Sequence, residues 1–329
     1  MKKAGLGMII ALAVIELGLR AIGYSAPSWH RLDPQLGWTL RASRHGIHAE
    51  NGARTPVRVS PAGFRDSERF LDKPAGVYRI AVLGDEYSEA LDTRLEDTWW
   101  WRLGPRLEAC GLADVEVLNF GVGGYSTAQE AVMLESTAMR YRPDLVLVQF
   151  SGDDVADNSF SLAKNKLRPF FILDERGVAR IDESFSFDPS FDRYMQTRYQ
   201  LGIEIADHAR VFQLARQLPD LLSLSRAHAA APVLSAPRDR VWEDAWRVTA
   251  QILERMDGYS KRNGARMALV AVGASAYARE RLSSMGFPVI ALADPFSHAA
   301  AAETVAQSLC PSGHSFGASS RGDAPGGAQ

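Results

Sequence analysis

The chain has 329 residues, of which 46% are hydrophobic and 23% are charged, and its formal net charge is -2. These values are ordinary for a globular protein and exclude a wholly disordered chain, a collagen-like repeat and a polytopic membrane protein. The nearly balanced charge also argues against a nucleic-acid-binding protein, which usually carries a basic excess. The length is sufficient for one large α/β domain.

The chain begins with a basic and then apolar segment. Lys2 and Lys3 precede an apolar run that Glu16 and Arg20 interrupt. This order is typical of an export signal, and the spacing lets the two interrupting charges pair on one helix face. We expect residues 1–24 to form an uncleaved signal-anchor helix that places the body of the chain outside the cytoplasm. A cleaved signal peptide and an ordinary soluble helix are the alternatives.

Two further segments lack the periodicity of regular elements. Residues 25–76 are rich in Pro, Gly, Arg and His, and we expect a linker that becomes an irregular arm packed on the domain. Three histidines in this segment, His30, His45 and His48, have no acidic or metal-ligand spacing, which favours exposed loop positions. Residues 311–329 are dominated by small and charged residues, so we predict a disordered tail.

Between these segments, residues 77–310, short apolar strands alternate with helical patterns. The predicted strands are residues 78–83, 115–120, 144–150, 265–272 and 288–293, and the main helices are residues 99–110, 126–139, 192–225 and 241–263. This alternation predicts βαβ units and a parallel sheet. An insertion over about 160–235 should begin with a β-hairpin at 170–182, with its turn at 174–177. The insertion could cover a pocket or contact a partner.

Residues with catalytic potential follow the first three predicted strands. In an open parallel sheet, ligands bind beyond the carboxyl ends of the strands. Asp85 and Glu86 follow the first strand, residues 119–124 form a glycine-rich turn after the second, and Asp153 and Asp154 follow the third. Converging carboxylates would raise one pKa or recruit a divalent cation. The glycine-rich turn supplies free N–H groups, but it matches neither a dinucleotide nor a P-loop motif, so we expect no cofactor.

Several of these motifs resemble the SGNH/GDSL hydrolase superfamily. The strand-end motifs are Gly84-Asp85, Asn119-x-Gly-x-x-Gly124 and Gly152-x-Asp154. The leader Glu16-Leu-x-Leu-Arg20, the arm Ser60-Pro-Ala-Gly-Phe-Arg-Asp66 and the segment 153–158 resemble its membrane-anchored bacterial members. The resemblance covers residues 30 to 295.

The resemblance implies a three-layer α/β/α, flavodoxin-like fold with parallel strand order 2-1-3-4-5, following an N-terminal membrane helix. It implies a protein of the bacterial inner membrane with its globular domain in the periplasm. The superfamily hydrolyses esters or transfers acyl groups, including acetyl groups on polysaccharides, with a serine nucleophile after the first strand. Its oxyanion hole uses a glycine after the second strand and an asparagine after the third, and a late Asp/His pair activates the serine.

This sequence departs from the superfamily at the positions that carry the chemistry. Glu86 occupies the nucleophile position, and a carboxylate cannot act as an activated hydroxyl. Asp153 occupies the asparagine position, where a carboxylate would repel an oxyanion instead of donating to it. Gly124, at the other oxyanion position, is retained. Ser88 is a candidate substitute nucleophile, although it suits the first turn of a helix equally well.

The late acid–base pair is also altered. His314 stands where the final loop of the superfamily is expected, but Pro311 and Ser312 stand where its acidic partner should be. His298 lies four residues after Asp294, which suits an ordinary helical pair. Either histidine, or neither, is the relic of the catalytic base.

The sequence therefore supports two hypotheses. In the first, the protein has lost acyl transfer and binds an acyl ester of a small molecule or polysaccharide, with a scaffold role in cell-envelope polysaccharide acylation. In the second, it is an ester hydrolase or acyltransferase with a rearranged nucleophile. The two cysteines, Cys110 and Cys310, match no zinc motif, and their pairing is not deducible from the sequence.

Overall fold

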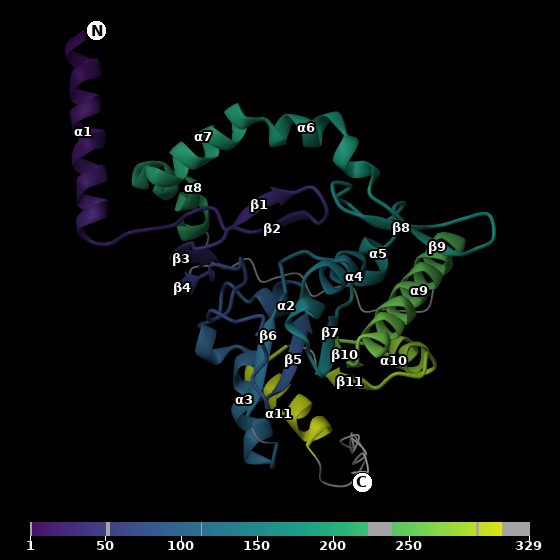
Figure 1. The fold of residues 1–329 in the computed structure, drawn as a ribbon. Coiled ribbons are helices and arrows are strands. Elements are labelled where there is room, and N and C mark those ends of the chain that lie inside the picture. The colour runs from purple at the N-terminus through teal and green to yellow at the C-terminus, as the bar shows by residue number, and fades with distance from the viewer. Residues whose placement is uncertain (1, 51–52, 113, 223–238, 294–295, 311–329) are drawn as a thin grey trace, which may run out of the picture.

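The computed structural model describes the chain except for residue 1 and residues 51–52, 113, 223–238, 294–295 and 311–329. Its centre is a five-stranded parallel sheet with the order β11-β10-β7-β5-β6 (Figure 1). The strands are β5 (Tyr78–Leu83), β6 (Val115–Asn119), β7 (Leu145–Phe150), β10 (Arg266–Val272) and β11 (Val289–Leu292). Numbered along the chain from β5, this order is 2-1-3-4-5, which confirms the predicted topology.

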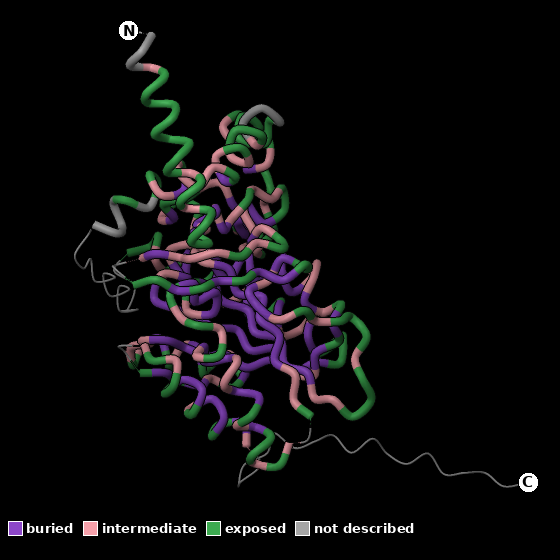
Figure 2. Tube along the Cα trace, turned by 90° about the vertical axis from the view of Figure 1, so that its left-hand side faces the viewer, coloured by how far each residue is buried: buried purple, intermediate pink, exposed green. Residues whose placement is uncertain are grey.

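Helices cover both faces of the sheet, which makes the three-layer architecture. Ala81 and Leu83 of β5 belong to the core beneath α4, α9 and α10, while Ile80 and Val82 belong to the core beneath α3 and α11. These helices are α3 (Trp99–Ala109), α4 (Thr127–Ser136), α9 (Arg240–Arg262), α10 (Ala276–Ser283) and α11 (His298–Leu309). Burial of both faces explains the continuously apolar strands, and Figure 2 shows the buried interior.

The register of the sheet brings three loops to one edge. Val82 pairs with Asn119 of β6 and with Leu147 of β7, so these strands end at nearly the same level. Two short helices begin directly beyond the edge, α2 (Glu86–Glu89) after β5 and α5 (Asp154–Asp157) after β7. The third loop, residues 120–126, connects β6 to α4.

The segment that we predicted to be an irregular arm contains two antiparallel hairpins. They are formed by β1 (His30–Asp33) with β2 (Gly37–Leu40), and by β3 (His45–Glu50) with β4 (Ala53–Arg58). The loop interpretation is therefore wrong for all three histidines, because His30 lies in β1 and His45 and His48 lie in β3. Only His45 is exposed, whereas His30 and His48 contact carboxylates. These short strands bury few side chains, so they lack the alternation that identifies a strand in sequence.

The insertion after α5 begins as predicted. A hairpin of β8 (Phe170–Leu173) and β9 (Ala179–Asp182) closes on Asp174, whose Oδ1 accepts from the N–H of Arg176 and of Val178. Three helices follow, α6 (Pro189–Met195), α7 (Thr197–His208) and α8 (Arg210–Leu222). The three 3-10 helices of the described chain are η1 (Leu95–Asp97), η2 (Ala138–Tyr141) and η3 (Ser184–Phe187).

The N-terminal helix α1 (Lys2–Ala21) extends away from the body, and most of its residues from 5 to 21 are exposed (Figures 1 and 2). The predicted pair is present, because Arg20 Nε donates to Glu16 Oε1 at 2.7 Å. The same two side chains attach the helix to the body: Arg20 donates to the carbonyl of His208, and Glu16 accepts from the N–H of Val211. Within the described part of the chain, no helix combines the length and apolar character needed to cross a membrane.

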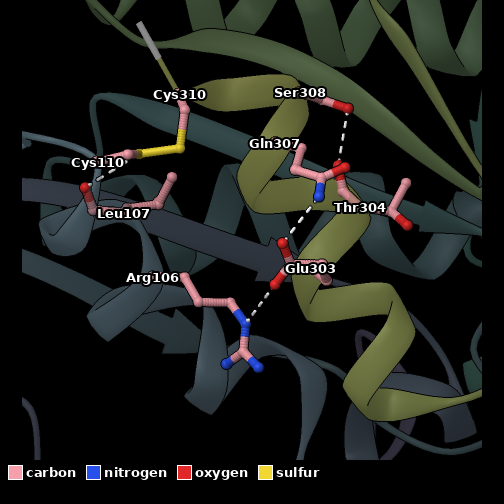
Figure 3. Close-up of a disulfide and its surroundings, with 8 residues drawn as sticks. All are labelled: Arg106, Leu107, Cys110, Glu303, Thr304, Gln307, Ser308 and Cys310. Atoms are coloured by element: carbon pink, nitrogen blue, oxygen red, sulfur yellow. Dashed lines mark hydrogen bonds and ion pairs between the residues drawn. A yellow bond between two sulfur atoms is a disulfide. The ribbon is translucent and has the colours of Figure 1, made fainter. Parts of the chain in front are cut away.

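A disulfide joins the two cysteines, with their Cα atoms 5.8 Å apart (Figure 3). Cys110 directly follows α3 and Cys310 directly follows α11, so the bond ties together the carboxyl ends of two helices on the same face of the sheet. Arg106 and Glu303 form an ion pair between the same helices at 3.2 Å. The sequence left this pairing open because α11 was not predicted and its position was unknown.

Candidate functional site

Glu86 lies at the amino end of α2, where the superfamily motif would place the nucleophile. Asp85 caps this helix, since its Oδ1 accepts from the N–H of Tyr87 at 3.0 Å. The Glu86 side chain is directed toward the glycine-rich turn, where its Oε2 accepts from the N–H of Gly124 at 3.3 Å. Gly124 has a φ of +73°, a conformation that other residues adopt at a cost. The two positions are therefore in direct contact.

Ser151 brings the carboxylates of the first and third loops together. Its hydroxyl lies 2.6 Å from Asp85 Oδ2 and 2.6 Å from Asp153 Oδ1, and Asp154 Oδ2 lies 3.4 Å away. Asp154 is otherwise held by the N–H groups of Ser151 and Thr127. The expected convergence of Asp85, Asp153 and Asp154 is thus present, with a serine at its centre that the sequence reading did not single out.

This arrangement favours protonated carboxyl groups. Burial, followed by the charges of Glu86 and Asp154, raises the pKa of Asp85 well above its ordinary value. Burial and the charge of Asp153 raise the pKa of Asp154 to about 8. The pKa of Glu86 is also raised, by the loss of water around its carboxylate and by the charge of Asp153. The edge of the sheet therefore holds several carboxyl groups whose ionisation is disfavoured.

The other candidate residues lie in different environments. Ser88 is fully buried, and its hydroxyl donates to Gln149 Oε1 at 3.1 Å, so it fits a structural role within α2. His298 begins α11, and its Nδ1 accepts from the N–H of Trp99 at 3.2 Å. Burial lowers the pKa of His298 to about 4, so this ring is neutral. Asp294, the partner considered for His298, and His314 lie outside the described residues.

A histidine–carboxylate pair at this edge was missed by the sequence reading. His30 Nε2 of β1 lies 2.6 Å from Glu89 Oε1 of α2. Burial lowers the pKa of His30, but the charge of Glu89 and the hydrogen bond outweigh burial, and the pKa is raised. Glu89 also packs so closely on Gly123 that a Cβ there would lie 2.6 Å from its Oε2. The sequence indicated the glycine-rich turn, but it did not indicate that Glu89 and its partner His30 lie beside this turn.

Two packed side chains, Trp38 and Arg168, lie beside the glycine-rich turn. Trp38 Nε1 donates to the carbonyl of Gly123 at 3.0 Å, and the Arg168 guanidinium lies 4.9 Å from the centre of a Trp38 ring. Arg168 also pairs with Asp157 of α5 at 3.1 Å. The candidate site is thus bounded by the core loops, by the β1–β2 hairpin and by the start of the insertion.

The arrangement was also compared with the ligand sets of metal ions. In the described ranges, no three His, Cys, Asp or Glu side chains are grouped so that they could hold a metal ion. The divalent-cation alternative that the carboxylates suggested therefore has no ligand set among these residues.

Comparison with known proteins gives likeness at the level of fold. No protein-family model matches the chain, and no curated protein matches it. The crystal structure of TesA has a TM-score of 0.36 and 14% identity, and the match covers 71% of this chain and 98% of TesA. The lipase Lip_vut3 from a goat rumen metagenome has a TM-score of 0.33 and 11% identity, with coverages of 71% and 97%. A GDSL-like lipase from Bacteroides thetaiotaomicron has a TM-score of 0.23 and 12% identity, with coverages of 61% and 72%.

Proposed function

We propose that this protein is an SGNH-type α/β protein that has lost acyl transfer and binds an acyl ester without cleaving it. Its ligand would be a small molecule or a polysaccharide of the cell envelope, consistent with the motifs in its leader and arm. At this edge of the sheet, the proposed ligand site is surrounded by side chains from three loops, from the β1–β2 hairpin and from the start of the insertion. The reactive hydroxyl, however, is replaced by a carboxylate.

One observation carries the proposal: the N–H of Gly124 donates to the Glu86 carboxylate. An oxyanion hole needs free donors that point at the place where negative charge develops. Here a carboxyl oxygen of Glu86 already occupies the donor. Asp153 adds a second carboxylate at the position of the other donor, and it accepts a hydrogen bond instead of supplying one. Both departures work against a tetrahedral oxyanion.

The alternative, an active hydrolase with a rearranged nucleophile, is favoured by the pair of His30 and Glu89. A histidine held by a carboxylate is the usual means of activating a nucleophile. The pair lies at the same glycine-rich turn as Glu86, with Glu89 against Gly123 and Glu86 on Gly124. Ser88 does not supply the hydroxyl, because it is buried and donates to Gln149.

The proposal predicts that the purified full chain is not labelled by a fluorophosphonate probe and does not hydrolyse p-nitrophenyl acetate. The double variant Glu86→Ser with Asp153→Asn restores the hydroxyl and one amide donor. Because one oxyanion donor accounts for a factor of about 100 to 1,000 in rate, we expect the variant to gain hydrolysis of about this size. Labelling and the initial rate of p-nitrophenolate release measure the two effects.

Glu86→Gln is the matched control, because it removes the negative charge without adding a nucleophile, and it should stay inactive. Labelling of the unaltered chain at any serine would establish the active-hydrolase alternative. A double variant that folds but remains inactive would show that the acid–base pair needed to activate a serine is missing as well. Binding is tested separately, by retention on an immobilised O-acetylated polysaccharide compared with the same polymer after saponification.

We also propose that the chain is exported and held at the bacterial inner membrane by α1. The Cys110–Cys310 disulfide supports export, because such bonds persist in oxidising compartments. The basic start of the chain supports a cytoplasmic amino end. Alkaline phosphatase fused after residue 30 should therefore be active in bacterial cells and should sediment with the membrane fraction. An inactive fusion would contradict export, and an active fusion released to the soluble periplasm would contradict anchoring.

A further inference from the structure

The hydroxyl of Ser151 lies between two carboxyl groups from different loops. Asp85 Oδ2 and Asp153 Oδ1 are each 2.6 Å from Ser151 Oγ. Both distances are typical of a strong hydrogen bond between oxygens. A serine hydroxyl has one hydrogen, and an ionised carboxylate only accepts. The hydroxyl can therefore donate to one of the two oxygens, and the other contact needs a second hydrogen.

That second hydrogen must sit on one of the two carboxyl groups. Asp85 is 2% exposed, whereas Asp153 is partly exposed. Ionisation of a carboxyl group costs more free energy in the buried position, so the proton resides mainly on Asp85. Asp85 then donates to the hydroxyl of Ser151, and this hydroxyl donates to Asp153. The direction of the Asp85 pKa agrees with this order, although the count of hydrogens does not depend on it.

An unpartnered acid beside the bridge shows independently that this region binds protons. Glu130 of α4 is 1% exposed, and neither of its carboxylate oxygens has a hydrogen-bond partner among the described residues. Its charged neighbours are Asp85 and Asp154, and with burial they raise the pKa of Glu130 well above its ordinary value. An ionised carboxylate without donors would be too costly there, so Glu130 is neutral.

The remaining charged groups around the bridge come from every adjoining element. Glu86 of α2 and Asp154 of α5 face Asp85. Around the partly exposed Asp153 lie Glu86, Asp157 and Arg168. Three further carboxyl groups and one guanidinium thus surround the two bridged acids, so acidic groups predominate. Removing a proton from the bridge adds negative charge where it is already in excess.

We propose that Asp85, Ser151 and Asp153 form a proton-sharing bridge that holds the loop after β7 against the loop after β5. While the shared proton is bound, the bridge is closed. When the proton is lost as pH rises, Asp85 and Asp153 repel each other and the segment Ser151–Asn158 loosens. The bridge regulates the site that the proposed function assigns to a ligand, and it rests on that proposal for its biological use only.

The experiment measures protons taken up on folding by the full chain, from the pH dependence of urea unfolding. A folded state that holds one proton more than the unfolded state becomes less stable as pH rises from about 4 toward the folded pKa, and the unfolding constant rises about tenfold per pH unit. Asp85→Asn should remove one such tenfold-per-unit dependence. Asp153→Asn should lower by at least one unit the pH at which the proton is lost, because its amide supplies the missing hydrogen to Ser151.

Glu130→Gln is the matched control: it also removes one tenfold-per-unit dependence, because Glu130 is neutral when folded, but it should leave the pH at which the bridge loses its proton unchanged. Hydrogen exchange of residues 151–158 should accelerate beyond the intrinsic rate as the proton is lost in the unaltered chain. The proposal fails if Asp85→Asn keeps the full pH dependence, if Asp153→Asn leaves the pH of proton loss unchanged, or if exchange follows the intrinsic rate. Should Asp85→Asn not fold, the other two measurements decide. No ligand is used, so failure here leaves the proposed function intact.

Discussion

Replacing both cysteines, Cys110→Ala with Cys310→Ala, is expected to lower the free energy of unfolding by about 4 kcal/mol. The bond closes a loop of 200 residues, so its loss gives the unfolded chain much more conformational freedom. The folded state should change little, because Val305 and Leu309 keep α11 packed on the sheet. Urea unfolding followed by tryptophan fluorescence measures the difference, and the denaturant slope should increase as the unfolded state expands.

Reduction provides the internal control for this prediction. Adding a reductant to the unaltered chain should reproduce the stability of the double variant, whereas the variant itself should not respond. If the variant and the unaltered chain unfold at the same urea concentration, the bond does not restrain the unfolded state. Trp99 and Trp100 pack on the same face of the sheet as α11. If their fluorescence no longer changes on unfolding of the variant, the lower stability reflects local disruption of that layer in the folded state.

The sheet was predictable because its strands are buried on both faces. Successive residues of β5, such as Ile80 and Ala81, enter the cores on opposite faces of the sheet. The strand therefore forms a continuous apolar run that can be recognised in the sequence. The β8–β9 hairpin was predictable from the turn chemistry of Asp174. The β1–β2 and β3–β4 hairpins carry neither signal. The helix α11, rich in alanine, has a weak apolar pattern and was missed for that reason.

The site was predictable in part, for a related reason. Glu86, Gly124 and Asp153 follow strands, and the parallel topology alone brings strand ends together. The partner of Glu89 was not predictable, because His30 comes from a hairpin 59 residues away whose packing no local pattern specifies. The role of Ser151 was hidden too, since a serine after a strand is ordinary until two acids are placed around it.

The arm motif Ser60–Asp66 acquires a physical role through Arg65, and its loss defines the second large effect. Arg65 is 1% exposed and donates to the carbonyls of Glu89 and Ala90, at the end of α2, and of Thr93 just beyond it. Arg65→Ala would leave the carbonyls of Glu89 and Thr93 without this donor, remove one of the two donors to the Ala90 carbonyl, and leave a cavity beside the helix. Each unsatisfied buried group costs about 1–3 kcal/mol, so we expect a loss of about 4 kcal/mol in the free energy of unfolding.

Arg94→Ala is the matched control, because Arg94 directly follows Thr93 but is exposed and pairs at the surface with Glu96, so its loss should cost less than about 1 kcal/mol. The arm should also position the site, since the helix that Arg65 holds carries Glu86 and Glu89. In the background of Glu86→Ser with Asp153→Asn, Arg65→Ala should therefore reduce the gained p-nitrophenyl acetate hydrolysis in the fraction that remains folded, whereas Arg94→Ala should not. Equal unfolding curves for the two arginine variants would show that solvent replaces the buried guanidinium. A destabilised variant with undiminished hydrolysis would show that Arg65 supports the fold without orienting α2.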